Sequence, residues 1–212
     1  FDEAFDSNGE AIVSDGNPSE MDCGEGVDLA DLRLGGVQEE LVREIAATGT
    51  PVVAVVIQGR PHALAGIAEH CAAILCAWYP GPEGGTAIAE ILFGAVNPSG
   101  KLPVSLPRSS AQLPVYYNQK NPGRPRPYID MPASALYPFG FGLSYTTFEY
   151  GEIKLSRETV TAEEIEAGGS VEVRVTVANA GLVVGAETVQ LYVQASGSPI
   201  TRRTLELKGF RK

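Results

Sequence analysis

The sequence predicts an α/β protein in which a mostly parallel α/β sandwich domain precedes a smaller β-sandwich. Two observations carry this prediction. Residues 36–93 repeat the order of an amphipathic segment followed by a short continuous apolar run, which is the pattern of a parallel sheet covered by helices. After Phe148 the apolar residues recur at every second position instead, which is typical of half-buried antiparallel strands.

The first part of the chain supplies the helices and the parallel strands. Residues 36–48 are expected to form a helix, because apolar residues recur every four positions from Val37 to Ile45 and Gly49 is suited to end it. The β-branched run at 51–57 is apolar on both faces and predicts a fully buried parallel strand. The same reasoning predicts a short helix at 63–70, a buried strand at 72–78 and a helix at 86–93.

The composition changes near Lys101. Eight of the 15 prolines lie between Pro103 and Pro138. Because proline fixes φ and lacks a backbone donor, this stretch is predicted to be an extended connector rather than a regular element. Several tyrosines, phenylalanines and leucines within it are expected to anchor it to the domain that it wraps.

The C-terminal part of the chain is predicted to form β-strands. The valines from Val171 to Val177 alternate with other residues, and a second run follows at Thr188–Val193. We expect these two runs to be an antiparallel strand pair of a sandwich. The 65 residues from Phe148 to the last residue are fewer than the about 100 of a complete sandwich of this kind.

The composition also excludes classes of protein. No apolar run approaches the about 18 residues of a membrane helix, so no membrane partner is expected. The formal net charge is −10, which argues against a nucleic-acid partner because such a partner needs a clustered basic face. Half of the 26 acidic residues lie within residues 1–50, where only Arg33 and Arg43 are basic. The three cysteines form no disulfide framework, and Cys71 and Cys76 are expected to be buried thiols.

The acidic loop at 14–31 is the best candidate for chemistry when the residues are considered alone. Its carboxylates stand among glycines just before the α/β layer. They can act as a general acid, as metal ligands or as solvating charge. The spacing does not match a calcium-binding EF-hand loop, and no metal site is expected.

Other polar motifs favour structural roles. His62 and His70 are the only histidines and lie in no nucleophile motif. We expect His62 to be structural near a loop and His70 to lie at a helix end. The glycine-rich stretch at 79–85 lacks a P-loop lysine, so no nucleotide or other cofactor is expected. Trp78 ends a predicted strand, which favours core packing over stacking on a sugar.

An ordered series of short motifs gives the chain a family resemblance. The motifs are Gly-Glu-Gly-Val-Asp at 24–28, Gly-Arg-Pro at 59–61, Trp-Tyr-Pro-Gly-Pro-Glu-Gly-Gly at 78–85, Asn-Pro-Ser-Gly-Lys-Leu-Pro at 97–103, Leu-Tyr-Pro-Phe-Gly-Phe-Gly-Leu-Ser-Tyr at 136–145 and Glu-Thr-Val-Gln-Leu-Tyr-Val at 187–193. In this order they resemble glycoside hydrolase family 3, and the chain is similar to the bacterial β-glucosidase and β-xylosidase members over about residues 20–212.

The resemblance implies a three-part parent protein with a TIM-type barrel, an α/β sandwich and a fibronectin type III-like sandwich. Residues 1–106 are then expected to be the α/β sandwich domain with its start truncated, 107–147 the connector, and 148–212 a fibronectin type III-like domain without its C-terminal part. The N-terminal barrel becomes a missing partner. The unpaired edge of a truncated sandwich also predicts a capacity to form homo-oligomers.

The resemblance further implies a retaining, exo-acting glycosidase for β-linked oligosaccharides. Such enzymes use two carboxyl groups. The nucleophilic aspartate comes from the barrel and has no counterpart here, whereas the general acid/base comes from the Gly-Glu-Gly loop. Glu25 is the matching position and Glu20 the second choice. Leu29, after Asp28, departs from the arginine that many relatives carry at that place.

For the 212 residues alone, these features predict an inactive fragment. It would supply the acid/base carboxylate of a β-glucosidase or β-xylosidase whose nucleophile lies elsewhere. The alternative is a non-catalytic module that binds carbohydrate or serves as a scaffold.

Overall fold

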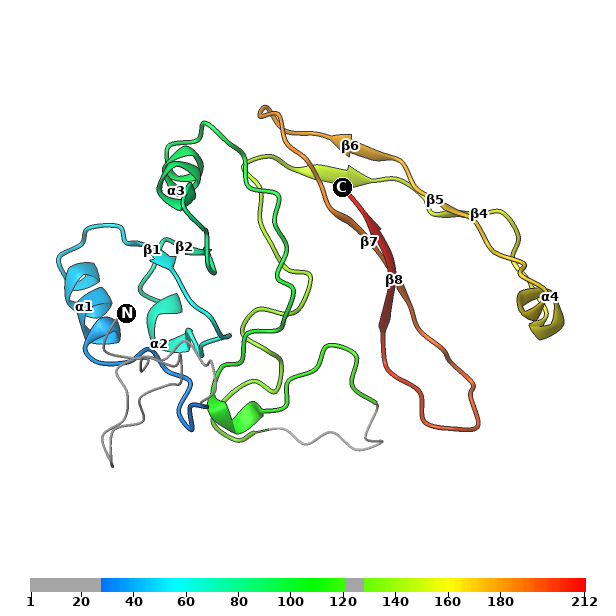
Figure 1. Ribbon diagram of the computed structural model, residues 1–212, viewed down its shortest axis with the longest axis horizontal. Helices are drawn as coiled ribbons and strands as arrows, with labels where there is room; N and C mark the ends of the chain where they lie inside the picture. Colours follow the sequence, from blue (N-terminus) through cyan, green and yellow to red (C-terminus); the bar gives the residue numbers. More distant parts are fainter. Residues whose placement is uncertain (1–27, 121–127) are drawn as a thin grey trace, which may run out of the picture.

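The computed structural model describes residues 28–120 and 128–212. Figure 1 shows an α/β layer built by the first part of the chain and two long β-hairpins built by the last part, with an extended connector running between them. Glu25, Glu20 and Cys23 lie outside the described residues. The acid/base prediction therefore rests on what the neighbouring described residues do.

The α/β layer follows the predicted order of helices and strands. It consists of α1 (Gln38–Ala47), β1 (Val53–Val56), α2 (Ala65–Ala68), β2 (Ala73–Cys76) and α3 (Gly84–Leu92). β1 and β2 pair in parallel, with Val53 opposite Ala73 and Val56 opposite Cys76. The parallel pairing is thus confirmed for these two strands. The observed ends differ from the predicted ones by one or two residues.

Helix α1 begins and ends where its sequence favours it. Glu39 and Glu40 lie in its first turn, where negative charge suits the positive end of the helix dipole. At the other end, the Gly49 N–H donates to Ala46 O at 2.9 Å. Gly49 has a φ of +82°, a conformation that strains residues with a side chain. The predicted glycine stop is therefore confirmed.

The core of this layer lies between β1, α2 and the start of the connector. Val56, Leu64, Ile67 and Leu106 are its buried residues, and Trp78 packs against them while partly buried. Leu64 and Ile67 belong to the loop after β1 and to α2. The core therefore holds the loop after β1 in place, and that loop leads to the candidate site.

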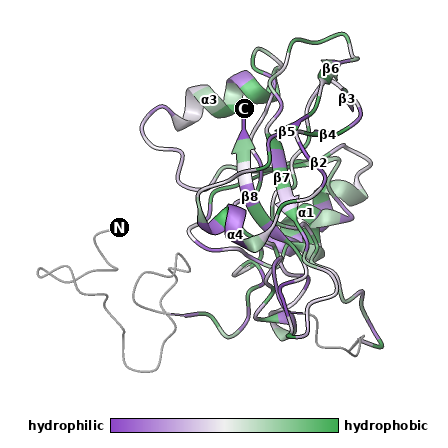
Figure 2. Ribbon diagram, turned by 90° about the vertical axis from the view of Figure 1, so that its right-hand side faces the viewer, coloured by the Kyte–Doolittle hydropathy of each residue, from purple (hydrophilic) through white to green (hydrophobic). Residues whose placement is uncertain are grey.

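The prediction that the two parallel strands are buried on both faces is wrong for the described part of the chain. Only Val56 among their residues is buried, and Val53 is 50% exposed. Leu41 of α1 is exposed as well, and Figure 2 shows hydrophobic residues on α3 and on the hairpin strands. Among the described residues the parallel sheet has two strands, so each of them is an edge strand with one side unpaired by a further strand.

The cysteines correct a related expectation. Cys71 and Cys76 are half-buried rather than buried. Burial still raises the pKa of both thiols. A raised pKa keeps a thiol protonated at neutral pH, and a protonated thiol is a poor nucleophile.

The connector is tied back to the α/β layer by its own backbone. Leu106 N–H donates to Tyr137 O at 2.8 Å, and Leu136 N–H donates to Leu106 O at 2.9 Å. The short 3-10 helix Ser110–Gln112 adds the buried Gln112 side chain. Its amide nitrogen donates to the carbonyl oxygens of three consecutive residues, Pro132, Ala133 and Ser134, at 3.2 to 3.3 Å. Gln112 thereby joins the two limbs of the connector.

The C-terminal residues form two hairpins. The first runs through β3 (Phe148–Tyr150), β4 (Lys154–Leu155), α4 (Ala162–Glu166), β5 (Val173–Arg174) and β6 (Val177–Asn179), and the second through β7 (Val189–Val193) and β8 (Glu206–Arg211). β3 pairs with β6, β4 with β5 and β7 with β8, all antiparallel. Figure 1 shows α4 at the far tip of the first hairpin, remote from the α/β layer.

The predicted pairing of the Val171–Val177 run with Thr188–Val193 is wrong. Both runs form strands, but each pairs with a different segment, the first with β3 and β4 and the second with β8. Asn179 shows why, because its side chain accepts from Gly181 N–H at 3.1 Å and donates to Val183 O at 2.8 Å. This local turn directs the chain away from β6, so β7 starts a second hairpin.

Candidate functional site

The carboxyl ends of β1 and β2 meet at one edge of the α/β layer. Because the strands are parallel, the loops that follow them, at 57–64 and 77–83, emerge side by side. Gln58 in the first loop is 4% exposed and His62 is 2% exposed, whereas Tyr79 in the second loop is largely exposed. This edge therefore combines buried polar groups with an exposed aromatic side chain, and we call it the carboxyl edge.

The segment that follows the acidic loop is fixed to the carboxyl edge. Leu32 O accepts from Ala63 N–H at 2.8 Å and lies 3.1 Å from Nδ1 of His62. Leu32 N–H donates to the hydroxyl of Ser110 at 2.8 Å. These contacts confirm that His62 lies near a loop, and its burial and its contact with the backbone agree with the predicted structural role. They also hold the chain just after residue 28 against the loop that follows β1.

A charged pair marks the point where the acidic loop enters the described fold. Asp28 Oδ1 lies 3.9 Å from Nη1 of Arg60, whose side chain is 11% exposed. Asp28 itself is fully exposed. Arg60 therefore turns a largely buried guanidinium toward the first described residue of the chain, three positions after Glu25.

A second carboxylate nearby stays on the surface. Asp31 accepts from Nε, Nη2 and the backbone N–H of Arg33 at 2.7 to 3.1 Å. These hydrogen bonds lower the pKa of the Asp31 carboxyl. An acid with a lowered pKa is ionised at neutral pH, so Asp31 does not suit the role of proton donor.

Two features of the carboxyl edge were not predicted from the sequence. Gln58 has neither its amide nitrogen nor its amide oxygen hydrogen-bonded within the described residues, although both atoms are buried. Trp78 has a φ of +52°, and among the described residues it is the only non-glycine residue with a positive φ. Such a conformation is costly for a side chain of this size and is typically retained at sites where it has a use. The sequence offers only a weak signal for both, since Gln58 directly follows one predicted strand and Trp78 is the last residue of the other.

His70 lies where its position was predicted. It follows the C-terminal end of α2, and its backbone N–H donates to Ile67 O at 3.0 Å. Its ring Nε2 lies 3.9 Å from Glu69. His70 is thus at a helix end and away from the loops of the carboxyl edge.

The described ranges also contain no ready metal site and no membrane helix. No three His, Cys, Asp or Glu side chains among residues 28–120 and 128–212 lie close enough together to hold a metal ion. Within the same ranges no helix has the length and the hydropathy needed to cross a membrane.

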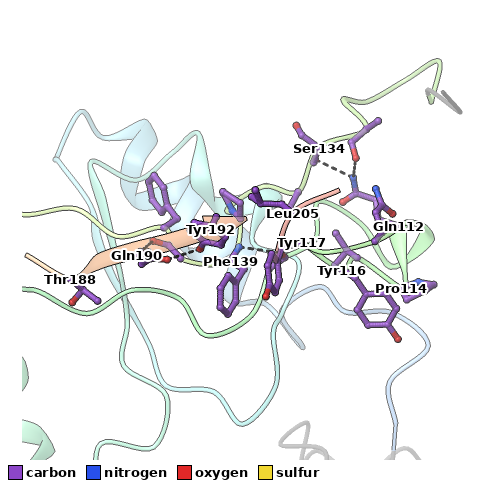
Figure 3. Close-up of a pocket in the computed structure, with 18 of the residues that line it drawn as sticks. Gln112, Pro114, Tyr116, Tyr117, Ser134, Phe139, Thr188, Gln190, Tyr192 and Leu205 are labelled. Carbon is purple, nitrogen blue, oxygen red and sulfur yellow. Dashed lines mark hydrogen bonds between the residues drawn. The ribbon is translucent and has the colours of Figure 1, made fainter. Parts of the chain in front are cut away.

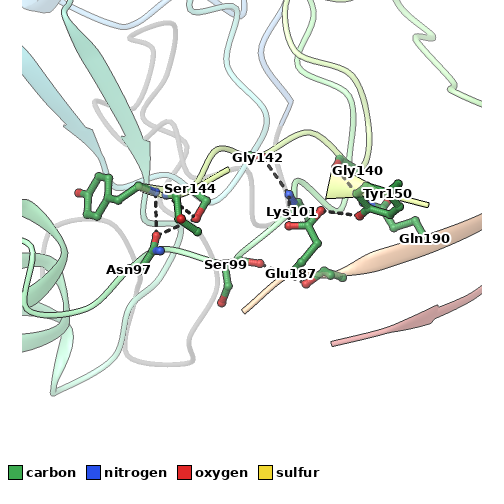
Figure 4. A network of polar contacts seen from close by, with 12 residues as sticks. Asn97, Ser99, Lys101, Gly140, Gly142, Ser144, Tyr150, Glu187 and Gln190 are labelled. Atoms are coloured by element: carbon green, nitrogen blue, oxygen red, sulfur yellow. Dashed lines mark hydrogen bonds and ion pairs between the residues drawn. The ribbon is translucent and has the colours of Figure 1, made fainter. Parts of the chain in front are cut away.

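The remaining motifs meet at a different place, the junction between the α/β layer and the hairpins (Figure 4). The carboxylate of Glu187 lies 3.3 Å from Lys101 Nζ and accepts from the Tyr150 hydroxyl at 2.8 Å. Lys101 also donates to Gly142 O at 2.9 Å. Burial and this hydrogen bond to a carboxylate raise the pKa of Tyr150 to about 12. The lysine, the glutamate and the tyrosine thus come from three separated segments.

Asn97 links the same segments a few residues away. Its amide oxygen accepts from the Ser144 hydroxyl at 2.9 Å and from Tyr145 N–H at 2.8 Å, and its amide nitrogen donates to Val184 O at 3.1 Å. The motifs at 97–103, 136–145 and 187–193 therefore act as the structural junction. The motifs at 59–61 and 78–85 belong to the carboxyl edge.

Comparisons with known proteins show the family of the chain. Residues 3–145 match the model of the Glycosyl hydrolase family 3 C-terminal domain. A β-xylosidase of Formosa agariphila is 44% identical over 100% of this chain and 29% of its own length. A periplasmic β-glucosidase of Salmonella typhimurium is 44% identical over 82% of this chain and 24% of its own length. The chain therefore spans about a quarter of the length of these relatives.

Solved structures show the same likeness. A β-glucosidase from Erythrobacter marinus is 46% identical and superposes with a TM-score of 0.80, over 87% of this chain and 24% of that one. A β-glucosidase from Listeria innocua in complex with glucose is 38% identical with a TM-score of 0.81, over 89% of this chain and 27% of that one. Sequence motifs, fold and family model agree, and the chain belongs to glycoside hydrolase family 3.

Proposed function

We propose that the protein to which this chain belongs is a retaining, exo-acting β-glycosidase for glucosides or xylosides, and that Glu25 of this chain is its general acid/base. The observation that carries the proposal is the position of Asp28, three residues after Glu25 in the sequence, 3.9 Å from the Arg60 guanidinium at the carboxyl edge. From the separation of Glu25 and Asp28, which is at most about 11 Å of extended chain, we infer that Glu25 acts at that edge. Parallel strands place their working loops there.

The proposed chemistry needs one carboxyl group that gives and then takes a proton. Glu25 would protonate the leaving glycosidic oxygen in the first step and deprotonate the attacking water in the second. For this its pKa must lie near neutrality, which a closed and largely water-free site can provide. The nucleophilic carboxylate would come from the part of the relatives that this chain does not span. The partner of this chain is then a barrel domain, and its ligand a β-linked oligosaccharide.

A substitution of Glu25 in the full-length protein tests the assignment. Glu25→Gln should lower kcat by about 10²- to 10⁴-fold on aryl glycosides with poor leaving groups. It should affect activated aryl glycosides much less in the first step, and azide should restore their turnover by replacing the deprotonated water. Glu20→Gln is the matched control and should keep nearly full activity. A Glu25→Gln enzyme with normal activity on poor leaving groups would contradict the proposal, and a loss at Glu20→Gln instead would move the role to that residue.

The second candidate function applies to the 212 residues by themselves. A chain that spans about a quarter of its relatives is suited to a non-catalytic role, as a carbohydrate-binding or scaffolding module. Incubation of the purified chain with a chromogenic β-glucoside separates the cases. We expect no turnover, and genuine turnover by this chain alone would contradict the placement of the nucleophile elsewhere.

A further inference from the structure

A wide cleft lies between the connector and one face of β7 (Figure 3). Its volume is about 1270 Å³. Tyr116 and Tyr117 of the connector line one side, and Gln190 and Tyr192 of β7 line the other. Successive side chains of a strand point to opposite faces, so Gln190 and Tyr192 share the face that β7 turns toward the connector.

One wall of the cleft is a rigid aromatic surface. The rings of Tyr117 and Phe139 are stacked, with centroids 4.1 Å apart and an interplanar angle of 13°. Tyr192 meets Tyr117 edge to face, with centroids 6.1 Å apart, and its hydroxyl donates to the Gln190 amide at 2.6 Å. Because these rings are already held in place, a ligand that packs on them orders few side chains. Next to them, Tyr116 is 64% exposed and offers its ring to the cleft.

The cleft is electrically almost neutral. Its single charged lining residue among those described is Glu187. The Lys101 ammonium, 3.3 Å away, compensates that charge, and the Tyr150 hydroxyl occupies one of its oxygens. The other polar lining groups are amides and hydroxyls. A phosphate, a nucleic acid or a cation would therefore find no uncompensated charge among the described lining residues, which favours an uncharged ligand.

Stacked aromatic rings beside neutral amides and hydroxyls match the surface of a sugar. A pyranose ring presents a C–H face that packs on an aromatic ring, and a rim of hydroxyls that bond to amides and hydroxyls. The cleft is larger than the about 300 to 1,000 Å³ of sites for single small molecules. We propose that this cleft is a non-catalytic binding site for a β-linked oligosaccharide of two or more sugar units. The choice of sugar rests on the proposed function, but none of the described lining residues belongs to the loops at 57–64 and 77–83 of the carboxyl edge.

Titration calorimetry of the 212-residue chain with cellotetraose and with xylotetraose tests the site. We expect saturable binding of at least one of the two. Tyr116→Ala, at an exposed ring, should weaken that binding about three- to tenfold. Ala133→Arg places a bulky side chain at another exposed position of the cleft and should weaken it too. The matched control is Phe93→Ala, at an aromatic residue that is 89% exposed directly after α3, and this variant should bind as the unsubstituted chain does.

Three outcomes would overturn the site. They are no saturable binding up to about 10 mM ligand, equal binding by Tyr116→Ala and Phe93→Ala, or binding that is lost in Glu25→Gln and kept in Tyr116→Ala. The last outcome would place the sugar at the acidic loop. This titration does not measure catalysis, so its failure leaves the acid/base assignment intact. Conversely, a fully active Glu25→Gln enzyme would leave the cleft result unchanged.

Discussion

The ion pair between Lys101 and Glu187 should be a main support of the junction between the α/β layer and the hairpins. The two side chains are only 15% and 16% exposed. Lys101→Met keeps most of the apolar stem but removes the ammonium. It leaves the Glu187 carboxylate with the hydrogen bond from Tyr150 and leaves Gly142 O without its donor. We therefore expect this substitution to lower the free energy of unfolding strongly.

The geometry sets the size of the effect. At 3.3 Å and an effective dielectric constant of about 20, two unit charges attract by about 5 kcal/mol. Desolvation of both groups offsets part of this, and removal of one partner of a buried pair typically costs about 3 kcal/mol or more. We expect losses of about 3 kcal/mol for Lys101→Met, about 2 for Glu187→Gln and about 3 for the double substitution. The coupling free energy is then about 2 kcal/mol.

Urea unfolding of the four proteins at pH 7 measures this cycle. Trp78 is the one tryptophan of the chain and packs on the core of the α/β layer, so its fluorescence reports that layer, while circular dichroism reports the hairpins. The surface pair Arg174–Glu172, 2.9 Å apart and more than half exposed, is the matched control and should show a coupling below about 0.5 kcal/mol. Additive single losses at Lys101 and Glu187 would refute the assignment of the junction to this pair.

Three further predictions concern single residues. Gln58→Met should raise the free energy of unfolding by about 1 kcal/mol, because it removes a buried amide that has no partner among the described residues. Gln112→Met should lower it by about 2 kcal/mol, because it removes the hydrogen bonds of a buried amide to three carbonyl oxygens and leaves the Arg108 N–H without its acceptor. A loss of stability in Gln58→Met would mean that the Gln58 amide is bonded. The pKa of Tyr150 is raised to about 12, so protonated Tyr150 contributes its full stabilisation below the usual value of about 10, and this contribution is lost as pH rises through 12. The free energy of unfolding should therefore fall more steeply from pH 10 to 12 in the unsubstituted chain than in Tyr150→Phe. Equal slopes would contradict this. Gly140→Ala should lower the melting temperature and reduce the free energy of unfolding by about 2 kcal/mol. The reasons are that the φ of Gly140 is +80° and that an added Cβ would collide with the Gln190 amide. An unchanged melting temperature would show that the turn can relax.

The helices and strands were predictable because they depend on the spacing of apolar residues along the chain. The helix at Gln38–Ala47 and the strand at Val53–Val56 follow from periodicity and from Gly49, and these reach the structure nearly unchanged. Burial was overestimated for Val53, because an apolar run reports which faces can be covered and not whether a covering layer is present. Strand pairing failed beyond Asn179, since the partner of β7 is set by a side-chain turn and not by alternation.

The candidate site could likewise be predicted from the sequence only in part. The motif at 24–28 points to Glu25 through resemblance, and the described geometry adds only the anchoring of its neighbour Asp28 at Arg60. The unpartnered amide of Gln58 and the positive φ of Trp78 arise from tertiary packing. The sequence shows only that these residues lie at the ends of predicted strands, so the missing partner and the positive φ were found in the structure.

The separation of the motifs into two places has a consequence for how substitutions act. Lys101, Asn97 and Glu187 bond to one another's segments at the junction and do not reach the carboxyl edge, so their loss should appear in stability and leave the rate per folded molecule unchanged. Gln58 and Arg60 lie at the carboxyl edge, where a buried amide without a partner is unfavourable for folding. A residue retained at a cost to stability is expected to serve activity. Unfolding and kinetic measurements on the same variants should therefore sort the family motifs into the two groups that the geometry defines.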